Sequence, residues 1–564
     1  MMMFSAPILF LLAAAALAFI PVRFRAPLML ATPVLALISI IAFGAGNHGL
    51  LNVINFDLVF YRIDSLSMPF GIVFCIAAFL ASLYSWHVRD LMQQIATMAY
   101  AGAALGGVFA GDLIALFVWW ESIAVASVFL IFARGTAGAM ATGMRYLLIQ
   151  VFSGMLLFAG LLVHFYDTGS IAFNHLGLVS FGTWLIFIAF GIKCAFPLLH
   201  NWLQDAYPAA TVTGTVVLSI FTTKMAVYAL ARGYAGTEIL VYIGAVMALF
   251  PILFAIIEND LRRVLAYSLN SQLGFMVVGV GIGTELALNG TVAHAFSSVL
   301  YKSLLFMSVG AVLYRTGTSK ASELGGLYRT MPVTMVCCVI GAMSVAAFPL
   351  FSGFISKSLI IDAASKNSYY VVWFCLVVAS AAVLAHTTIK IPYFAFFAKD
   401  SGKRPEEAPK HMRMAMIATA FLCVFIGVFP GPLYSILPFE VDYKPYTFGH
   451  VITQLQLLSF AALACVYLLR VGLYPLDKRG VNIDTDWVYR KAIPSLLPHA
   501  VTDIASLNAS LRTWAMRRLE RLQLHVARYA SPTGPLADSW GVKAMVGAVV
   551  VLMFAILLFN LFKG

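Results

Sequence analysis

Four lysines lie inside long apolar segments of this 564-residue sequence. They are Lys193, Lys224, Lys302 and Lys357. A lysine at the centre of a membrane-spanning helix costs at least about 2.5 kcal/mol, so four unpaired lysines would cost more than about 10 kcal/mol. Ionisable side chains at such positions usually mark a path for ions or protons. For Lys357, a position nearer to the membrane interface is the alternative.

Glu121 is the acidic counterpart of these lysines. It lies in the segment Phe117-Val-Trp-Trp-Glu-Ser, near the middle of another apolar stretch. We expect it to pair with Lys193 or Lys224. Burial and a nearby carboxylate shift the pKa of a lysine in opposite directions. A lysine that alternately gains and loses a carboxylate partner can therefore bind and release a proton near neutral pH.

His294, Ser298 and Lys302 are spaced four residues apart, so a helix places them on one face. A stripe of titratable and hydroxyl groups can carry a hydrogen-bonded chain of water. A lone histidine in an apolar segment is more often a core residue with a satisfied hydrogen bond. The alignment of His294 with Lys302 favours a proton relay instead.

The sequence also predicts two helix breaks. Pro197 has no N–H, so the carbonyl of Lys193 loses its helical partner. Broken backbone at membrane depth is tolerated in buried protein or beside a hydrated cavity. The segment Ala195-Phe-Pro-Leu recurs as Ala347-Phe-Pro-Leu. Paired spans interrupted by proline are typical of transporters built from inverted repeats.

Further polar residues lie near predicted helix ends. His386 and Lys390 are candidates for the inside exit of a proton path. Lys390 and Lys543 lie close to the ends of their spans, where a lysine can snorkel to the membrane interface. Asp205 is expected to cap the helix that follows it.

The elements that must position these residues are membrane-spanning helices. The sequence is 62% hydrophobic and 11% charged, whereas soluble domains carry about 25% charged residues. A spanning helix needs about 20 mostly apolar residues. We therefore expect an all-α polytopic membrane protein with about sixteen transmembrane helices. The expected spans are 4–22, 27–46, 66–86, 93–110, 112–133, 142–165, 178–198, 208–231, 237–257, 263–283, 288–314, 331–364, 369–397, 414–437, 451–470 and 541–562.

The net charge of +12 follows from the same topology. Lys and Arg concentrate in alternate loops, as the positive-inside rule requires, and this argues against nucleic acid as a partner. With the expected spans, this charge distribution predicts a multi-pass protein with both termini outside, and we expect it in the bacterial inner membrane. The seven cysteines form no CxxC pair, and the sequence has no GxxxxGK or placed GxGxxG motif. We expect no metal site, no cofactor and no catalytic site within the chain itself.

Residues 475–540 interrupt the membrane-spanning pattern. The part 475–498 is polar, and 501–530 reads as an amphipathic, strongly basic helix on the cytoplasmic side. Such a helix either lies in the membrane interface or packs as a strut on a neighbouring subunit. The apolar run 541–562 then returns to the membrane.

Two long motifs carry a family resemblance. The stretch Lys193-Cys-Ala-Phe-Pro-Leu-Leu-His-Asn-Trp-Leu-Gln-Asp-Ala resembles a family segment in which a lysine precedes Phe-Pro-Leu-His-x-Trp-Leu-x-Asp-Ala. Ile256-Glu-Asn-Asp-Leu-Arg-Arg-Val-Leu-Ala-Tyr-Ser is similar to a second hallmark. Both are typical of the antiporter-like subunits of respiratory complex I, membrane hydrogenases and Mrp sodium/proton antiporters. Over roughly residues 60–400 the sequence looks closest to the D-type subunits of Mrp antiporters, while its long tail looks like that of the largest complex I antiporter-like subunit.

The resemblance implies a division of the chain around two inverted repeats of five helices each, both containing broken helices. The expected parts are 1–92 with three helices, the repeats 93–232 and 233–398, two further helices in 399–474, the polar segment and amphipathic helix in 475–540, and the last span in 541–564.

The resemblance also implies functional roles. Ser298 stands where many members carry a second histidine, so the relay is expected to depend more on water here. The family's proton-relay positions fall on Glu121, Lys193, Lys224, His294, Lys302 and Lys357.

Three hypotheses of function follow. The first is a proton-translocating subunit, in antiport of Na+ or K+ or in proton conduction, working with other integral membrane subunits. The second is a membrane anchor that energises a soluble cytoplasmic partner, as in proton-driven uptake of inorganic carbon. The third is a subunit of a redox-linked ion pump such as a NADH-quinone oxidoreductase.

Overall fold

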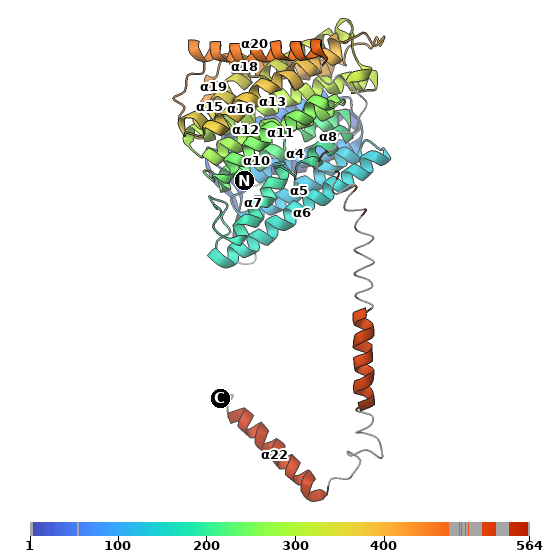
Figure 1. Ribbon diagram of the computed structural model, residues 1–564, viewed down its shortest axis with the longest axis vertical. Coiled ribbons are helices and arrows are strands. Elements are labelled where there is room, and N and C mark those ends of the chain that lie inside the picture. Colours follow the sequence, from blue (N-terminus) through green and yellow to red (C-terminus); the bar gives the residue numbers. More distant parts are fainter. Residues whose placement is uncertain are drawn as a thin grey trace. The chain divides into compact units, whose positions relative to one another are not determined.

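A computed structural model describes residues 4–53, 56–472, 510–525 and 541–561, together with residues 484, 487, 491 and 495. The chain divides into two compact units, Met1–Asn482 and Ile483–Gly564. The first unit is a bundle of helices laid side by side, with α20 along one edge (Figure 1).

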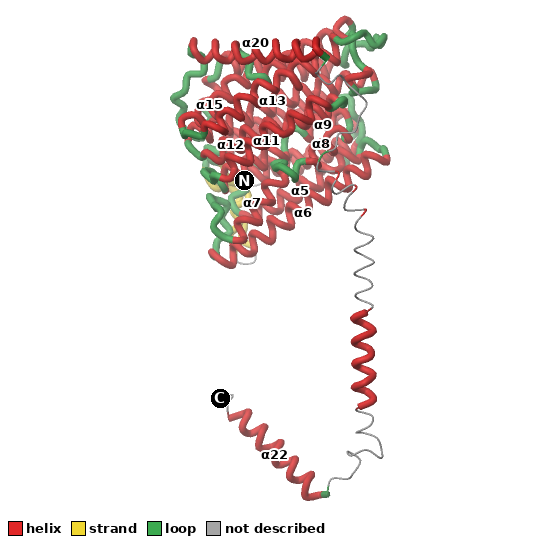
Figure 2. Tube along the Cα trace, viewed as in Figure 1, coloured by secondary structure: helices red, strands yellow, loops and turns green. Residues whose placement is uncertain are grey.

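Helices form nearly all of the first unit (Figure 2). Its first half contains α1 (Ala6–Leu17), α2 (Val22–Phe43), α3 (Ser67–Tyr84), α4 (Leu91–Phe109), α5 (Leu113–Phe132), α6 (Ala137–Thr168), α7 (Phe181–Lys193), α8 (Asn201–Ala209), α9 (Val212–Leu218) and α10 (Thr222–Gly233). The second half contains α11 (Ile239–Ile257), α12 (Leu261–Ile282), α13 (Glu285–Thr316), α14 (Pro332–Val345), α15 (Ser352–Lys366), α16 (Tyr370–Val383), α17 (Lys390–Pro392), α18 (Lys410–Val428), α19 (Gly431–Tyr434) and α20 (Phe448–Val471). Short 3-10 turns, η2 (Ala321–Glu323) and η3 (Leu327–Arg329), and π-helical turns, η4 (Leu384–Ile389) and η5 (Tyr393–Phe397), complete it.

Eleven helical segments of the described residues are long and apolar enough to cross a membrane. Shorter apolar helices accompany them, among them α1, α7 and α14. A multi-pass membrane protein is therefore confirmed, while the count of about sixteen spans and their grouping into repeats stay predictions. The long span expected at 331–364 is divided at the predicted break into two helices, α14 and α15.

One part of the first unit is not helical. Strands β1 (Gly46–Val53) and β2 (Phe56–Ile63) form an antiparallel hairpin, with Gly46 opposite Ile63 and Val53 opposite Phe56. The expectation of an all-α chain is wrong here. Tyr61 turns inward from β2, where its ring lies 5.0 Å from that of Phe109, so the hairpin packs against the bundle through alternate side chains.

The hairpin marks one end of the helices, which we call the hairpin end. Gly111 N donates to the carbonyl of Val59 on β2 at 2.8 Å. Leu176 N donates to Gly233 O at 2.8 Å. The start of α5, the loop after α6 and the end of α10 therefore meet at this end.

Both predicted helix breaks are present and have the same backbone. Ala195 and Leu198 have φ of 60° and 70°, and the corresponding Ala347 and Leu350 have φ of 58° and 76°. Phe196 N bonds to the carbonyl five residues earlier, that of Gly191, and Phe348 N does the same to Met343. The repeated four residues thus encode one structure, in which a non-glycine residue enters the left-handed region on either side of each proline.

The centre of the bundle is formed by α12, α13 and the pair α9–α10. The most apolar stretches of α12 and α13 are 94% buried, and that of α9–α10 is 100% buried, whereas that of α20 is 11% buried. Polar side chains on these central helices must therefore find partners inside the protein.

The second unit contains a helix over residues 510–525 and α22 (Val542–Leu561). Side chains of 510–525 are exposed, including Trp514 and Leu519. The expected polar segment 475–498 and the remainder of the expected amphipathic helix 501–530 lie almost entirely outside the described residues. Its role at the cytoplasmic side stays a prediction.

All seven cysteines are free. Six are buried, and Cys375 is partly buried. Among the described residues no group of three or more His, Cys, Asp or Glu side chains is placed to hold a metal ion.

Candidate functional site

Lys193 is the last residue of α7, and its side chain reaches α5. Its Nζ donates to the carbonyl oxygen of Trp120 at 2.5 Å and lies 4.6 Å from the centre of the indole ring. Trp120 Nε1 in turn donates to Ser153 Oγ on α6 at 3.0 Å. The ammonium is thus fully buried, next to the helix break, and held by a neighbouring helix rather than by its own.

Glu121 follows Trp120 on α5. It is the charged group whose field acts on Lys193, but no ion pair within 4.0 Å joins the two side chains in the described part of the chain. The expected pairing is therefore electrostatic and not a contact. Glu121 Oε1 is buried without a hydrogen-bond partner. A carboxylate held near an ammonium, without bonding to it, can set the charge of the lysine while staying free to move.

Gly154 on α6 makes room for this carboxylate. A Cβ added at Gly154 would coincide with Glu121 Oε1. On the other side, Glu121 lines a cavity of about 870 Å³ between α4 and α5 with Ile95, Val125 and other apolar residues. The carboxylate of Glu121 therefore lies between Gly154 of α6 and a mostly apolar cavity.

Lys224 lies on α10, next to the junction with α9. Its Nζ donates to Ser219 O at 2.8 Å, at the point where α9 gives way to α10. Ser219 lies just after the end of α9, so its carbonyl is one of those that a helix end leaves unpaired. Lys224 is close enough to Lys302 for the two charges to interact.

Lys302 and His294 lie on α13, and each has a hydroxyl partner on another helix. Lys302 Nζ donates to Ser268 Oγ on α12 at 2.6 Å, and Thr387 Oγ1 on η4 donates to the same oxygen at 2.7 Å. His294 Nδ1 lies 3.0 Å from Ser356 Oγ on α15. The predicted stripe on one helix face is therefore a buried polar junction of α12, α13, α15 and η4.

Lys357 occupies the second broken helix, on α15. Its Nζ donates to Val345 O at 2.7 Å and lies 5.0 Å from the centre of the Phe275 ring. Val345 stands four residues before Pro349, so its carbonyl is the one that the proline deprives of a helical partner. Lys357 is 1% exposed, so its ammonium is enclosed by protein, and the alternative of a position nearer to the membrane interface stays open.

A cavity of about 570 Å³ reaches Lys357. Asp362 and Lys366 line it one and two turns further along α15, and their side chains form an ion pair at 2.9 Å. Gly236 N, just after the end of α10, donates to Val280 O near the end of α12, so α12 ends and α13 begins at the hairpin end. Gly290 near the start of α13 lies against Ile360, so this end of α15 is also at the hairpin end. The lysine of the second break thus has a polar route toward that end.

Several buried polar atoms beside the lysines lack a hydrogen-bond partner. Groups of this kind inside a protein are satisfied by water. The side chains concerned include Thr223, Asn270, Gln272, Ser297, Ser298, Ser352, Ser380 and His386. Ser298 is among them, and the expectation that the relay depends more on water here stays a prediction.

The two candidates for the inside exit, Lys390 and His386, are both buried. Lys390 is 1% exposed and its Nζ donates to Ile256 O at 2.7 Å and Glu258 O at 2.6 Å, so it caps the end of α11 and does not snorkel. His386 is fully buried on the π-helical turn η4, with Nδ1 2.8 Å from Ala382 O. Neither side chain is exposed, and their role as an exit stays a prediction.

Asp205 does not cap the next helix. It lies within α8 and pairs with Arg145 at 2.8 Å, while Thr211 caps α9. The polar partners on α12 were missed altogether. Ser268 and Gln272 lie four residues apart within an apolar span, so the spacing that selected His294, Ser298 and Lys302 would have found them too.

Comparison with known proteins gives one family and several relatives. Residues 110–383 match the family described as NADH:quinone oxidoreductase/Mrp antiporter, transmembrane. A Na(+)/H(+) antiporter subunit of Alkalihalophilus pseudofirmus is 28% identical over 358 residues, covering 59% of this chain and 72% of that protein. Hydrogenase-4 component B of Escherichia coli is 27% identical over 421 residues, covering 65% of this chain and 62% of that protein. The NAD(P)H-quinone oxidoreductase chain 4 1 of Synechococcus elongatus is 30% identical over 316 residues, covering 52% of this chain and 59% of that protein.

Two solved structures share the fold. A chain of the Mrp complex from Dietzia sp. aligns with a TM-score of 0.66 at 19% identity, covering 82% of this chain and 95% of that chain. A chain of the membrane-bound sulfane sulfur reductase, an archaeal respiratory membrane complex, aligns with a TM-score of 0.72 at 22% identity, covering 98% and 99%. The family match and the curated relatives confirm the recognition made from the two sequence motifs, and the two structures show the shared fold.

Proposed function

We propose that this chain is a proton-translocating, antiporter-like subunit of a larger membrane complex, because its residues 110–383 match the family described as NADH:quinone oxidoreductase/Mrp antiporter. The Na(+)/H(+) antiporter relative supports this reading over that of a membrane anchor for carbon uptake. The redox-linked hypothesis would place the same subunit in a different complex, so it does not alter the proposed path.

The observation that carries the proposal is how the four buried lysines are held. Each ammonium donates to a carbonyl or hydroxyl oxygen, and none forms an ion pair within 4.0 Å in the described part of the chain. A permanent carboxylate partner would fix a lysine in its charged form. Oxygen acceptors alone leave each amine able to lose and regain a proton.

The proposed path runs from Lys193 through Lys224 and Lys302 to Lys357. Glu121 sets the charge of Lys193 from a position close by. His294, together with water at the unpartnered polar groups, links the steps between Lys302 and Lys357. Release takes place through the cavity beside Lys357, and the hairpin end faces outside under the proposed orientation.

The proposed partners are other integral membrane subunits. The similar chains in solved structures belong to multisubunit membrane complexes. We extend this proposal to the transport of Na+ or K+ in exchange for protons. We also propose that a soluble protein docks at the basic helix near 510–525.

The test is proton-coupled transport by the complex in membrane vesicles. We expect Lys193→Ala or Glu121→Ala to reduce it to background, because each removes a proton-binding group from the start of the path. Lys320→Ala is the control, since Lys320 is an exposed lysine paired with Glu323 and should leave transport unchanged. Full transport by a well-assembled Lys193→Ala, Glu121→Ala double variant would refute the proposal.

A further inference from the structure

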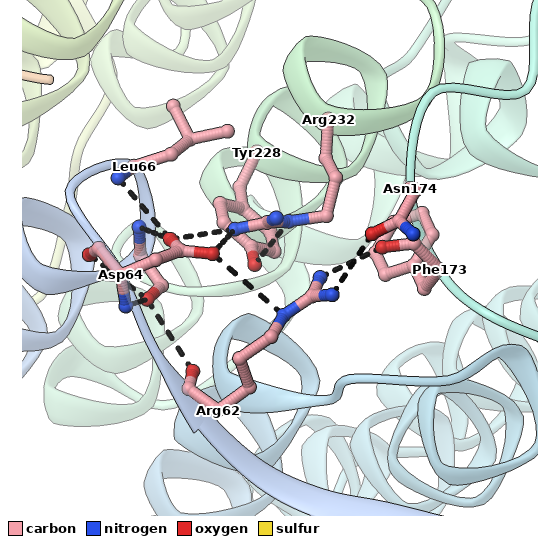
Figure 3. A network of polar contacts seen from close by, with 8 residues as sticks. Arg62, Asp64, Leu66, Phe173, Asn174, Tyr228 and Arg232 are labelled. Atoms are coloured by element: carbon pink, nitrogen blue, oxygen red, sulfur yellow. Dashed lines mark hydrogen bonds and ion pairs between the residues drawn. The ribbon is translucent and has the colours of Figure 1, made fainter. Parts of the chain in front are cut away.

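A network of charged side chains lies at the hairpin end of the first half (Figure 3). Arg232 Nη2, at the end of α10, donates to both carboxylate oxygens of Asp64 at 2.7 and 2.6 Å. Arg62 on β2 lies 3.7 Å from Asp64 and donates to Phe173 O at 2.7 Å and Asn174 Oδ1 at 3.0 Å. The network therefore joins the hairpin, the start of α3, the loop after α6 and the end of α10.

One face of α10 connects this network to the row of lysines. Lys224, Tyr228 and Arg232 are spaced four residues apart, so they lie on one face over about 12 Å of helix. Tyr228 is fully buried, and its hydroxyl accepts a hydrogen bond from Arg232 Nε at 2.7 Å. A proton on Lys224 thus has a polar stripe leading toward the hairpin end.

The network at the end of this stripe cannot take up a proton. Arginine stays charged in proteins. Burial alone would raise the pKa of Asp64, but Arg232 and the backbone amide of Ser67 outweigh it, and the pKa lies below its usual range. Asp64 also accepts hydrogen bonds from the amides of Leu66 at 3.2 Å and Ser67 at 2.9 Å. Its oxygens are therefore occupied.

The charge of the network opposes an approaching proton. It contains two guanidinium groups and one carboxylate, a net charge of +1. Asp112, a further carboxylate near Arg62, is held by the amides of Val59 and Ala115, each at 2.7 Å, and by no arginine hydrogen bond in the described structure. Side-chain exposure of Arg62 and Arg232 is only 16% and 11%, so water screens these charges weakly.

We propose that Arg62, Asp64 and Arg232 form an electrostatic seal that closes the first half of the path at the hairpin end, so that a proton on Lys224 passes to Lys302 and is not released. A fixed arginine at the mouth of a narrow path excludes protons in this way. The seal rests on the proposed path through Lys224. It leaves the cavity beside Lys357 in the second half as the release route.

The test is the passive proton leak of vesicles that contain the complex, driven by an imposed membrane potential and followed with an internal pH dye. Arg232→Gln removes one positive charge, and we expect the leak to rise at least about tenfold. Arg232→Lys keeps the charge and should leak as little as the unaltered protein. Asn174→Ala removes a neutral partner of Arg62 and should behave like Arg232→Lys.

Asp64→Asn separates a seal from a structural anchor. It breaks the same ion pair as Arg232→Gln but raises the net charge to +2, so the seal predicts no increase in leak. An anchor that merely holds the hairpin predicts equal leaks from Asp64→Asn and Arg232→Gln. That result, or an unchanged leak in Arg232→Gln, would overturn the seal.

Lys224→Ala distinguishes this proposal from the proposed function. In combination with Arg232→Gln, it should abolish the extra leak, because it removes the amine from which a proton would pass toward the hairpin end. A loss of coupled transport in Lys193→Ala without a leak in Arg232→Gln would reject the seal alone. Full coupled transport in Lys193→Ala would reject the proposed function, whatever the leak.

Discussion

The two broken helices have the same backbone but hold their lysines in opposite ways. In the first, Lys193 precedes the break and donates to a carbonyl of α5. In the second, the corresponding position is Val345, and Lys357 follows the break and donates to the carbonyl of Val345 itself. At the first break the hydrogen-bond acceptor of the lysine therefore belongs to a neighbouring helix. At the second break the acceptor is the carbonyl that the proline of the same break leaves without a helical partner.

This difference shows that the backbone of the break and the position of the lysine ammonium are determined by different residues. The four residues around each proline build the break, but they do not fix where the ammonium lies. Lys193 depends on α5, the helix that also carries Glu121, so the packing of α5 positions both groups together. Lys357 takes its hydrogen-bond acceptor from the break itself, and its surroundings open into a cavity.

The largest effect should come from disturbing the first arrangement at Gly154. Gly154→Ala places a methyl group where Glu121 Oε1 lies, so the carboxylate must leave its present position relative to Lys193. We expect coupled transport to fall on the order of a hundredfold, as small misplacements of a reacting group do. Gly138→Ala on the same helix is the control, because nothing lies within 4 Å of the added Cβ. Unchanged transport in assembled Gly154→Ala would show that the position of Glu121 does not matter.

A smaller effect should distinguish the two acceptors. Lys357→Met leaves the buried Val345 carbonyl without its lysine, whereas Lys193→Met leaves the Trp120 carbonyl inside a continuous helix. An orphaned buried acceptor costs about 1–3 kcal/mol. We expect Lys357→Met to have the lower free energy of unfolding by about this amount, measured by denaturant titration in micelles. Equal values for the two variants would mean that the freed carbonyl finds another partner.

The smallest effect should be the same in both helices. Ala195 and Ala347 have left-handed φ of 60° and 58°, which cost about 1–2 kcal/mol for a residue with a Cβ. Ala195→Gly and Ala347→Gly should each raise the free energy of unfolding by up to about 1 kcal/mol, because glycine relieves this strain and only part of the gain is lost to its larger entropy cost on folding. Ala346→Gly, at an ordinary helical φ of −72°, should lower it. Unequal gains would contradict the identity of the two breaks.

Features that depend on local sequence could be predicted. Pro197 and Pro349 act on the carbonyls four residues before them, so both breaks follow from the sequence alone. Long apolar runs likewise predict spanning helices. Strand β2 was missed because pairing with β1 depends on a partner outside the local window, and its alternating residues Phe56–Ile63 lie between two strong helical signals.

Positions that depend on packing could not be predicted. Which oxygen Lys193 meets is decided by the approach of α5 to α7, and no spacing in the sequence encodes that approach. Packing also decides the position of Lys390. Its place near the end of a span predicted that its side chain would reach the membrane interface. In the structure α11 ends beside it and offers three carbonyls. The lysines themselves were identifiable because their cost in an apolar segment is independent of their partners.

The burial of the native thiols has a practical consequence for topology. Because six of the seven cysteines are buried, and Cys375 only partly accessible, a membrane-impermeant maleimide should react weakly with the natural protein. Leu50 on β1 is 65% exposed, so Leu50→Cys adds one accessible thiol to a protein whose own cysteines react weakly. Labelling of intact cells would then report directly on which side of the membrane β1 lies.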